Sequence, residues 1–221
     1  MATAEKNRAE EDRPLYDRLV ELVFSGDYKL GSKFSERKLA EELQVSRIPL
    51  RESLAKVVAQ GLLLGGGKGE GVRLRRYTPD EIRQLYEFRQ FIEVGIVQTA
   101  AKYAQAEDLE RLEDIWTEMG THIGDYGSKV WAKLDHKFHD AFAQASHNKR
   151  AIQSMRLLLT ECHYVFYLRP NRPLSEISSE EGTAWMEKVH SEHRLLIDYI
   201  FSGNPIAAEK VMRLHLNVER L

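Results

Sequence analysis

The amino-acid sequence predicts a mainly α fold, in which a small three-helix domain with a β-hairpin wing precedes an all-α antiparallel helical bundle. Three observations lead to this prediction. Apolar residues recur with helical spacing along most of the chain, a glycine-rich run at 65–71 separates two short apolar stretches, and only helical periodicity follows Thr78-Pro79. The predicted parts are a mobile tail, 1–12, a first domain, 13–77, and a helical domain, 78–221.

The charge of the chain is unevenly divided. The 221 residues carry a formal net charge of −2, yet residues 28–77 contain eleven lysines and arginines and five glutamates, which gives this segment a charge of +6. A basic domain joined to an acidic remainder predicts a polyanionic partner for the first domain only. No apolar run approaches the roughly 20 residues needed to cross a bilayer, and the polar first residues lack the apolar core of a signal peptide. We therefore expect a cytoplasmic protein without a membrane partner.

The first domain has the pattern of a winged helix-turn-helix. Apolar stripes predict helices over 14–25, over 36–43 and from Ser46 to Gly61. The apolar residues 62–64 and the alternation at 72–75 predict two strands joined by the glycine-rich loop. That loop could also be a phosphate cradle, but it lacks the Lys-Ser/Thr end of a P-loop and no helix follows it.

The second helix of this motif presents arginines where a DNA-binding helix needs them. In a helix-turn-helix the N-terminal residues of the second helix contact base edges in the major groove. Arg47 and Arg51 are four residues apart and share a helical face, and arginine pairs with guanine or clamps a phosphate. Ser46 suits a phosphate, Arg37 can reach DNA from the preceding helix, and Lys68 lies at the wing tip. These residues predict binding to double-stranded DNA.

The second domain consists of six predicted helices. Gly, Asn and Pro separate helical segments at 79–105, 107–123, 128–146, 148–168, 181–202 and 204–220. Short connections predict antiparallel neighbours, and about 140 residues suffice for an independent core. On helix 128–146 the pattern assigns Trp131 to the buried stripe and His136 to the solvent-exposed face.

Histidines concentrate in this second domain, where all eight of them lie. Asp135 and His139 are four residues apart beside the apolar stripe of their helix, and His193 and His215 face inward on two later helices. The four side chains could converge on a divalent transition metal such as Zn²⁺ or Ni²⁺. Each histidine taken alone could instead be a hydrogen-bonded core residue, and the spacing leaves both alternatives open.

The stretch SERKLAEELQVSRIPLRESLAKVVAQGLL, residues 35–63, resembles the signature of the GntR superfamily of bacterial transcription regulators. In that signature Ser-Glu-Arg-x-Leu-Ala precedes Val-Ser-Arg-x-Pro-x-Arg-Glu, and the resemblance spans residues 14–76. The wing tip departs from the usual arginine- and proline-containing form. The resemblance implies that the DNA contacts come from Arg37, Ser46, Arg47, Pro49, Arg51, Gly67, Lys68 and Gly69.

Residues 79–221 resemble the FCD ligand-binding domain of one GntR branch. The matching motifs are Phe88-Arg89-x-x-x-Glu93, Asp135-x-x-Phe138-His139, Asn148, Glu192-His193-Arg194 and Met212-Arg213-x-His215. The resemblance implies the six-helix form of the domain and a small carboxylate effector that binds at the metal and beside Arg89. Arg89 could instead be a surface residue paired with Glu93. The implied metal is Zn, with Ni or Mn as alternatives, and its implied ligands are Asp135, His139, His193 and His215.

Together these observations predict a homodimeric transcription repressor that a small organic acid releases from operator DNA, and no enzymatic activity. Two alternatives remain open at this point. The helical domain could be a purely structural dimerisation domain of a constitutive DNA-binding regulator, or the metal site could activate water in a metal-dependent hydrolase. The hydrolase is disfavoured because four protein ligands leave little room for a substrate and no general acid or base is evident beside them.

Overall fold

The computed structural model describes residues 14–24, 28, 31–65, 71–126, 128–168 and 177–217. The predicted tail and the predicted wing contacts Gly67, Lys68 and Gly69 lie outside these residues. The chain forms two compact units, one that ends at Tyr77 and one that begins at Thr78. Each unit is described by itself.

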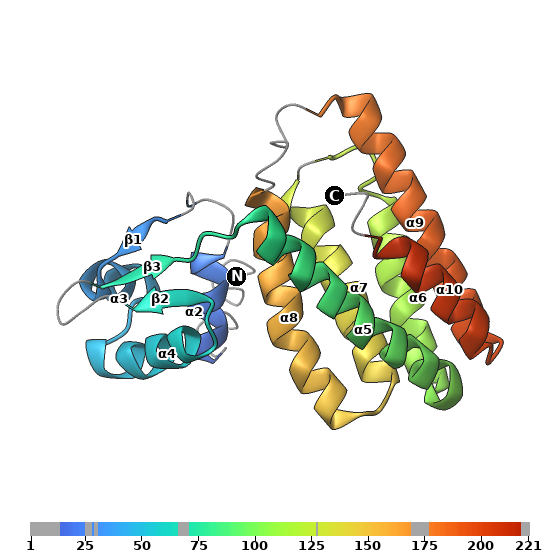
Figure 1. Ribbon diagram of the computed structural model, residues 1–221, viewed down its shortest axis with the longest axis horizontal. Coiled ribbons are helices and arrows are strands. Elements are labelled where there is room, and N and C mark those ends of the chain that lie inside the picture. Colours follow the sequence, from blue (N-terminus) through green and yellow to red (C-terminus); the bar gives the residue numbers. More distant parts are fainter. Residues whose placement is uncertain are drawn as a thin grey trace, which may run out of the picture. The chain divides into compact units, whose positions relative to one another are not determined.

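The first unit is a winged helix-turn-helix (Figure 1). Its helices are α2 (Leu15–Val23), α3 (Glu36–Leu43) and α4 (Arg47–Ala59). Its strands are β1 (Lys33–Phe34), β2 (Leu63–Gly65) and β3 (Val72–Leu74), which form an antiparallel sheet in the order β1-β3-β2. The helices enclose a small apolar core whose largest fully buried members are Leu19, Leu39, Leu50, Leu62, Leu63 and Leu74.

Local sequence signals set the turn between α3 and α4. The Ser35 hydroxyl accepts a hydrogen bond from the backbone N–H of Lys38 and so caps α3. Gln44 ends α3 in the left-handed conformation, with φ of 55°, and Ser46 begins α4 from an extended backbone. Leu39 and Leu50 pack inward on the two helices, so the first turn of α4 remains exposed.

The sheet contains one strand more than the predicted hairpin. β2 and β3 pair as expected, with Leu63 opposite Leu74, but β1 adds to the other edge of β3. A two-residue strand is too short to show alternation in the sequence, which is why it was not predicted. Gly71, with φ of 72°, lets β3 approach β1 closely, because a Cβ there would lie 2.1 Å from the carbonyl oxygen of Phe34.

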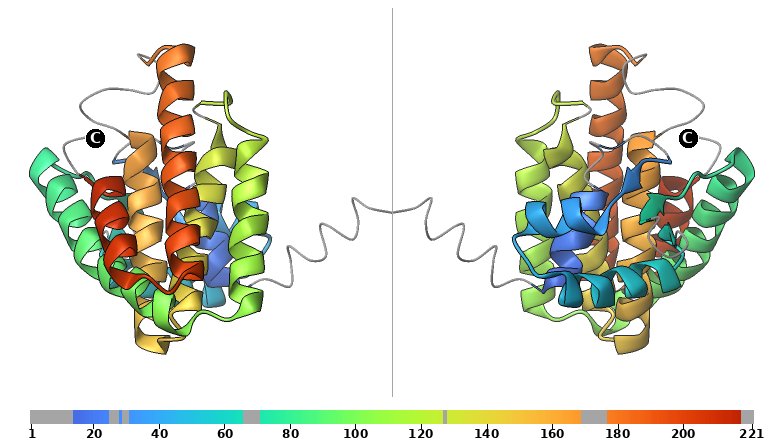
Figure 2. Two further views of the ribbon diagram at one scale, coloured as in Figure 1. Left: turned by 90° about the vertical axis from the view of Figure 1, so that its right-hand side faces the viewer. Right: turned by 90° about the vertical axis from the view of Figure 1, so that its left-hand side faces the viewer.

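The second unit is the predicted antiparallel helical bundle (Figures 1 and 2). Helix α7 packs against α5, α6 and α8, and α10 lies beside both α5 and α9. Phe138 and Phe142 of α7 are fully buried at the centre of the core. The six helices are α5 (Pro79–Tyr103), α6 (Ala106–Gly120), α7 (Lys129–Ala145), α8 (Lys149–Leu168), α9 (Ser179–Phe201) and α10 (Pro205–His215).

The bounds of these helices follow the sequence prediction closely, apart from the end of α10. The prediction extended the last helix to residue 220, whereas α10 ends at His215. Leu216 is the C-cap of α10, outside the helix, and its side chain is buried. No helix in the described part of the chain is long and apolar enough to span a membrane.

Candidate functional site

The first turn of α4 and the adjacent end of α3 form an exposed polar surface. A hollow there is lined by Arg37, Gln44, Ser46 and Arg47, so three of the predicted DNA-binding residues lie together. Arg47 makes no ion pair with any described residue, and the Ser46 hydroxyl forms no capping bond within α4. These groups are therefore available to an external anion, and the N-terminal N–H groups of the helix add to that capacity.

Arg51 lies on the same exposed face but has a partner that the sequence analysis missed. Its Nε donates to the Glu36 carboxylate of α3 over 2.6 Å, and both side chains remain accessible. An exposed ion pair of this kind contributes little to stability, so DNA could compete for the guanidinium. Ile48, beside Arg47, was also missed; its side chain is 73% exposed at the start of α4.

In the second unit, four potential metal ligands converge from three helices. Asp135 and His139 lie one turn apart on α7, His193 lies on α9, and His215 lies at the end of α10. One ligand atom from each residue lies within 4.8 Å of the others. The Nε2 of His215 is 3.2 Å from that of His139 and 3.3 Å from that of His193. Asp135 Oδ1 is 3.6 Å from the Nε2 of His193.

Two further carboxylates determine the tautomers of this cluster. The Nδ1 of His139 donates to Glu93, and the Nδ1 of His215 donates to Glu192 over 3.0 Å. An ionised carboxylate only accepts hydrogen bonds, so Nδ1 of each ring carries a proton, and an Nε2 without a proton directs its lone pair at the cluster. Lone pairs that face one another across 3.2 Å repel, and a bound cation would remove that repulsion.

The protonation state of the histidines in the cluster also favours a bound metal cation. Burial lowers the pKa of His139, and burial together with the neighbouring His215 and His139 lowers the pKa of His193 well below its usual value. Both imidazoles are therefore neutral near pH 7, which is the form that binds a metal. Four ligands about 2.0–2.2 Å from one ion lie roughly 3.3–3.6 Å apart in a tetrahedron. Three of the observed separations, 3.2, 3.3 and 3.6 Å, are close to this, and the His139–Asp135 separation is 3.9 Å. The residues present therefore fit a divalent transition metal.

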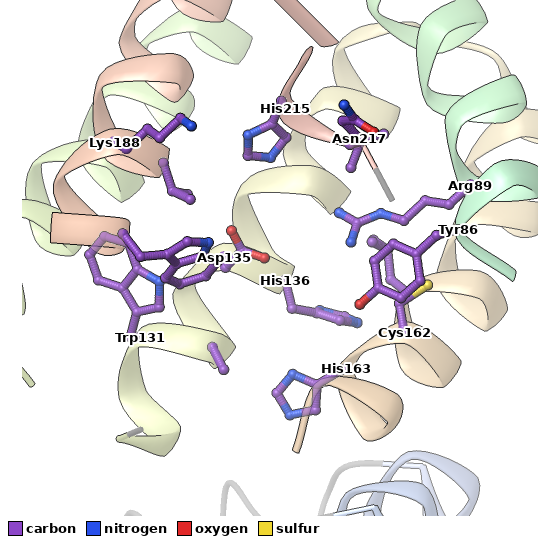
Figure 3. A pocket seen from close by; sticks show the side chains of 15 residues that line it. Tyr86, Arg89, Trp131, Asp135, His136, Cys162, His163, Lys188, His215 and Asn217 are labelled. Atoms are coloured by element: carbon purple, nitrogen blue, oxygen red, sulfur yellow. The ribbon is translucent and has the colours of Figure 1, made fainter. Parts of the chain in front are cut away.

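A cavity of about 150 Å³ opens beside the cluster, with Asp135 and His215 in its wall. Figure 3 shows Arg89 and Tyr86 on one side of it, with Cys162 close by. Arg89 is only 7% exposed, and it pairs with Glu93 through Nε. Its Nη2 is buried without a hydrogen-bond partner among the described residues. Arg89 thus pairs with Glu93, as one alternative expected, but as a buried residue of the cavity rather than a surface residue.

Both units of the chain match known protein families. Residues 12–71 match the model for bacterial regulatory proteins of the gntR family, and residues 84–218 match the FCD domain. The chain belongs to the GntR family. Its regulator domain and its FCD domain correspond to the two resemblances noted in the sequence, and the family consists of transcription regulators rather than enzymes.

Related GntR regulators cover nearly the whole chain. The HTH-type transcriptional regulator LutR of Bacillus subtilis (strain 168) is 31% identical over 218 residues, which cover 90% of this chain and 94% of LutR. A protein of Escherichia coli (strain K12) named as a regulatory protein of the L-lactate dehydrogenase operon is 30% identical over 220 residues, or 91% of this chain and 81% of that protein. The solved structure of E. coli McbR/YncC has the same fold, with a TM-score of 0.76, 15% identity and 91% of both chains covered.

One side chain of this GntR regulator, His136, lies in an environment that its helical position did not predict, and Trp131 lines the cavity as well as the core. His136 was assigned to the solvent-exposed face of α7, yet it lines the cavity together with His163 of α8. The helical repeat identifies the face of a helix, but α8 covers that face, which periodicity within α7 cannot show. Trp131 is buried as predicted, but it also lines the cavity.

His136 and His163 make the stability of the metal-free protein depend on pH in a predictable direction. Burial lowers the pKa of both His136 and His163 to about 4, whereas an unfolded histidine has a pKa of about 6.5. As the pH falls from 6.5 toward 4, the unfolded chain takes up protons that the folded chain does not, so stability falls. Between pH 7.5 and 5.5 we expect a loss of about 1 kcal/mol for each histidine. Urea denaturation in EDTA at each pH measures this loss of stability. A His136→Asn/His163→Asn variant whose stability falls with pH as steeply as that of the wild type would contradict its assignment to these two histidines.

Proposed function

We propose that this GntR-family chain binds double-stranded operator DNA as a homodimer, and that a small carboxylate effector bound at a metal in the FCD domain releases it. The observation that carries the proposal is the convergence of four metal ligands on the cavity that Arg89 lines. A winged helix-turn-helix followed by a helical bundle would by itself also be compatible with a regulator that binds DNA constitutively. A preformed metal and anion site in the core gives the second unit a ligand to sense.

The metal and Arg89 have complementary tasks in this proposal. Asp135, His139, His193 and His215 hold the ion, Zn in the first instance with Ni or Mn as alternatives, and the ion supplies a Lewis-acidic position for a carboxylate oxygen. Arg89 supplies a charged N–H donor, Nη2, that has no partner among the described residues. Glu93 holds Arg89 and His139 at once, so it links the anion-binding residue to the metal ligand.

The DNA-binding surface is assigned to the start of α4. Arg47 and Arg51 would contact guanine edges or phosphates, Ser46 a phosphate, and Ile48 the methyl group of a thymine. Pro49 lies exposed in the same first turn, and Arg37 approaches from α3. The effector can change DNA affinity only if it binds more tightly to one arrangement of the dimer than to the other. The name of the E. coli relative supports a small organic acid in that role.

A gel-shift titration tests the proposal as a whole. The metal-loaded protein is titrated onto its own promoter region with and without each member of a set of small carboxylates. We expect at least one acid to raise the protein concentration needed for half-maximal binding, and the same acid to raise the melting temperature of the metal-loaded protein. If no acid changes either quantity, the structural-domain alternative is favoured.

An apolar face on two neighbouring helices supports the homodimer. Phe88 and Phe91 of α5 and Ile206 and Leu214 of α10 are exposed, and the two helices pack side by side. Exposed apolar residues grouped in this way are typical of an interaction surface. A second copy of the chain would also supply the second recognition helix that a palindromic operator requires.

The Phe91→Asp variant is therefore expected to dissociate the dimer, because it places a charge on a side chain that is 70% exposed in the monomer. Analytical ultracentrifugation at micromolar protein measures the change. Phe201→Asp is the matched control, since Phe201 is 74% exposed on α9. If Phe91→Asp sediments as the wild type does, the face on α5 and α10 is not the dimer interface.

A further inference from the structure

One wall of the cavity carries a hydrogen-bond donor without a structural role. Trp131 is 3% exposed, and its Nε1 is buried without a partner among the described residues. A buried, unpaired N–H group is costly, and most such groups in native proteins have a partner. Trp116 provides the contrast within the same domain, because its Nε1 donates to the carbonyl oxygen of His190 over 3.0 Å. The Trp131 N–H is therefore a donor for which a bound ligand could supply the acceptor.

A positive charge lies at the same wall. Lys188 of α9 lines the cavity, is exposed, and makes no ion pair with any described residue. Figure 3 shows Trp131 and Lys188 on one side of the cavity, Arg89 and Tyr86 on the other, and Asp135 between them. The cavity thus offers two separate anion-binding ends, one at Arg89 and one at Trp131 and Lys188.

The spacing along α7 limits the size of a ligand that reaches both ends. Trp131 and Asp135 are one helical turn apart on the same face, which places their Cβ atoms about 5–6 Å from each other. A single small ligand in this cavity could therefore contact both residues. The small volume of the cavity is consistent with such a compact ligand.

We propose that the effector is a small dicarboxylate, whose first carboxylate binds at the metal and Arg89 and whose second accepts the Trp131 N–H and pairs with Lys188. This inference depends on the proposed function, which supplies the first carboxylate position. A monocarboxylate of the same length would leave Trp131 and Lys188 without partners. A hydroxyl group at that end could pair with Trp131 but would not neutralise the ammonium group of Lys188.

Isothermal titration calorimetry on the metal-loaded full-length protein tests the inference with succinate and butyrate, which share a four-carbon chain. We expect succinate to bind at least tenfold more tightly than butyrate. Trp131→Phe keeps an aromatic ring but removes the donor, and Lys188→Met removes the charge. Each is expected to reduce succinate affinity about tenfold and to leave butyrate affinity unchanged.

The control variant is Trp116→Phe, which removes a satisfied N–H. It is expected to lower the melting temperature of the ligand-free protein while keeping the preference for succinate, whereas Trp131→Phe should not lower that temperature. Equal affinities for the two acids, or an equal loss of both in Trp131→Phe, would overturn the inference and leave the proposed function intact. If no mono- or dicarboxylate binds, the proposed function fails and the inference fails with it.

Discussion

Replacing both Arg47 and Arg51 by alanine is expected to reduce operator affinity at least about a hundredfold, since each arginine–base pair contributes roughly 1–3 kcal/mol. The two side chains lie one turn apart on the exposed start of α4, next to the unused Ser46 hydroxyl. A gel shift on the protein's own promoter region at fixed salt measures the loss. The fold should be unaffected, because Arg51 makes only the exposed ion pair to Glu36 and Arg47 makes none with a described residue.

The matched control for this double variant is Lys56→Ala. Lys56 lies in the last turn of the same helix, so its removal lowers the charge of α4 without touching the first turn. It is expected to weaken binding only slightly, through the general attraction to phosphates. A double variant that binds the promoter as tightly as the wild type would show that α4 is not the recognition helix.

Periodicity and capping residues were sufficient to predict the helices of both units. Leu39, Leu50 and Phe138 all lie at the buried positions of a 3.6-residue repeat. Ser35 lies where α3 begins, and Gly61 lies just beyond the end of α4. The third strand was missed because Lys33–Phe34 is too short to show alternation and pairs with a strand almost forty residues away. Pairing of that kind is a property of the folded chain rather than of either segment.

Residue types and spacing predicted that Asp135, His139, His193 and His215 could converge, and the structure brings them together, but the spacing did not predict what surrounds them. The inward positions of Asp135 and His139 follow from the repeat of α7 alone. Glu93 was expected only as a possible partner of Arg89, and its bond to His139 depends on how α5 packs against α7. The sequence pattern of α7 predicts only that Trp131 is buried. That its Nε1 lacks a hydrogen-bond partner among the described residues is a separate property, and this property points to a ligand.

The hydrogen bonds of the histidine cluster bear on whether the second unit is a structural domain or a sensing domain. A core histidine that only stabilises a fold satisfies both of its ring nitrogens. His139 and His215 instead satisfy Nδ1 with Glu93 and Glu192 and direct Nε2 at one another. His193 has its Nδ1 buried without a partner among the described residues, which makes it the least well satisfied of the three. A metal-free cluster is therefore expected to destabilise the domain.

Substitution His193→Ala is expected to remove metal binding, with a loss of affinity of at least about a hundredfold, because it deletes a ligand from a site of four. Purified wild-type protein should contain one equivalent of metal per chain by mass spectrometry, and the variant should contain almost none. EDTA should lower the melting temperature of the wild type by roughly 10 °C if the bound metal stabilises the fold by about 4 kcal/mol. It should leave the melting temperature of His193→Ala unchanged.

The control for this variant is His190→Ala, on the same helix but outside the cluster. His190 stacks on Trp116, with ring centroids 4.4 Å apart, and hydrogen-bonds to its carbonyl oxygen, so its removal should lower stability as well. It should nevertheless keep one equivalent of metal. The pair of variants therefore separates loss of a ligand from loss of packing on α9. Wild-type protein that contains no stoichiometric metal, and that melts at the same temperature with and without added Zn²⁺, would instead favour a purely structural helical domain.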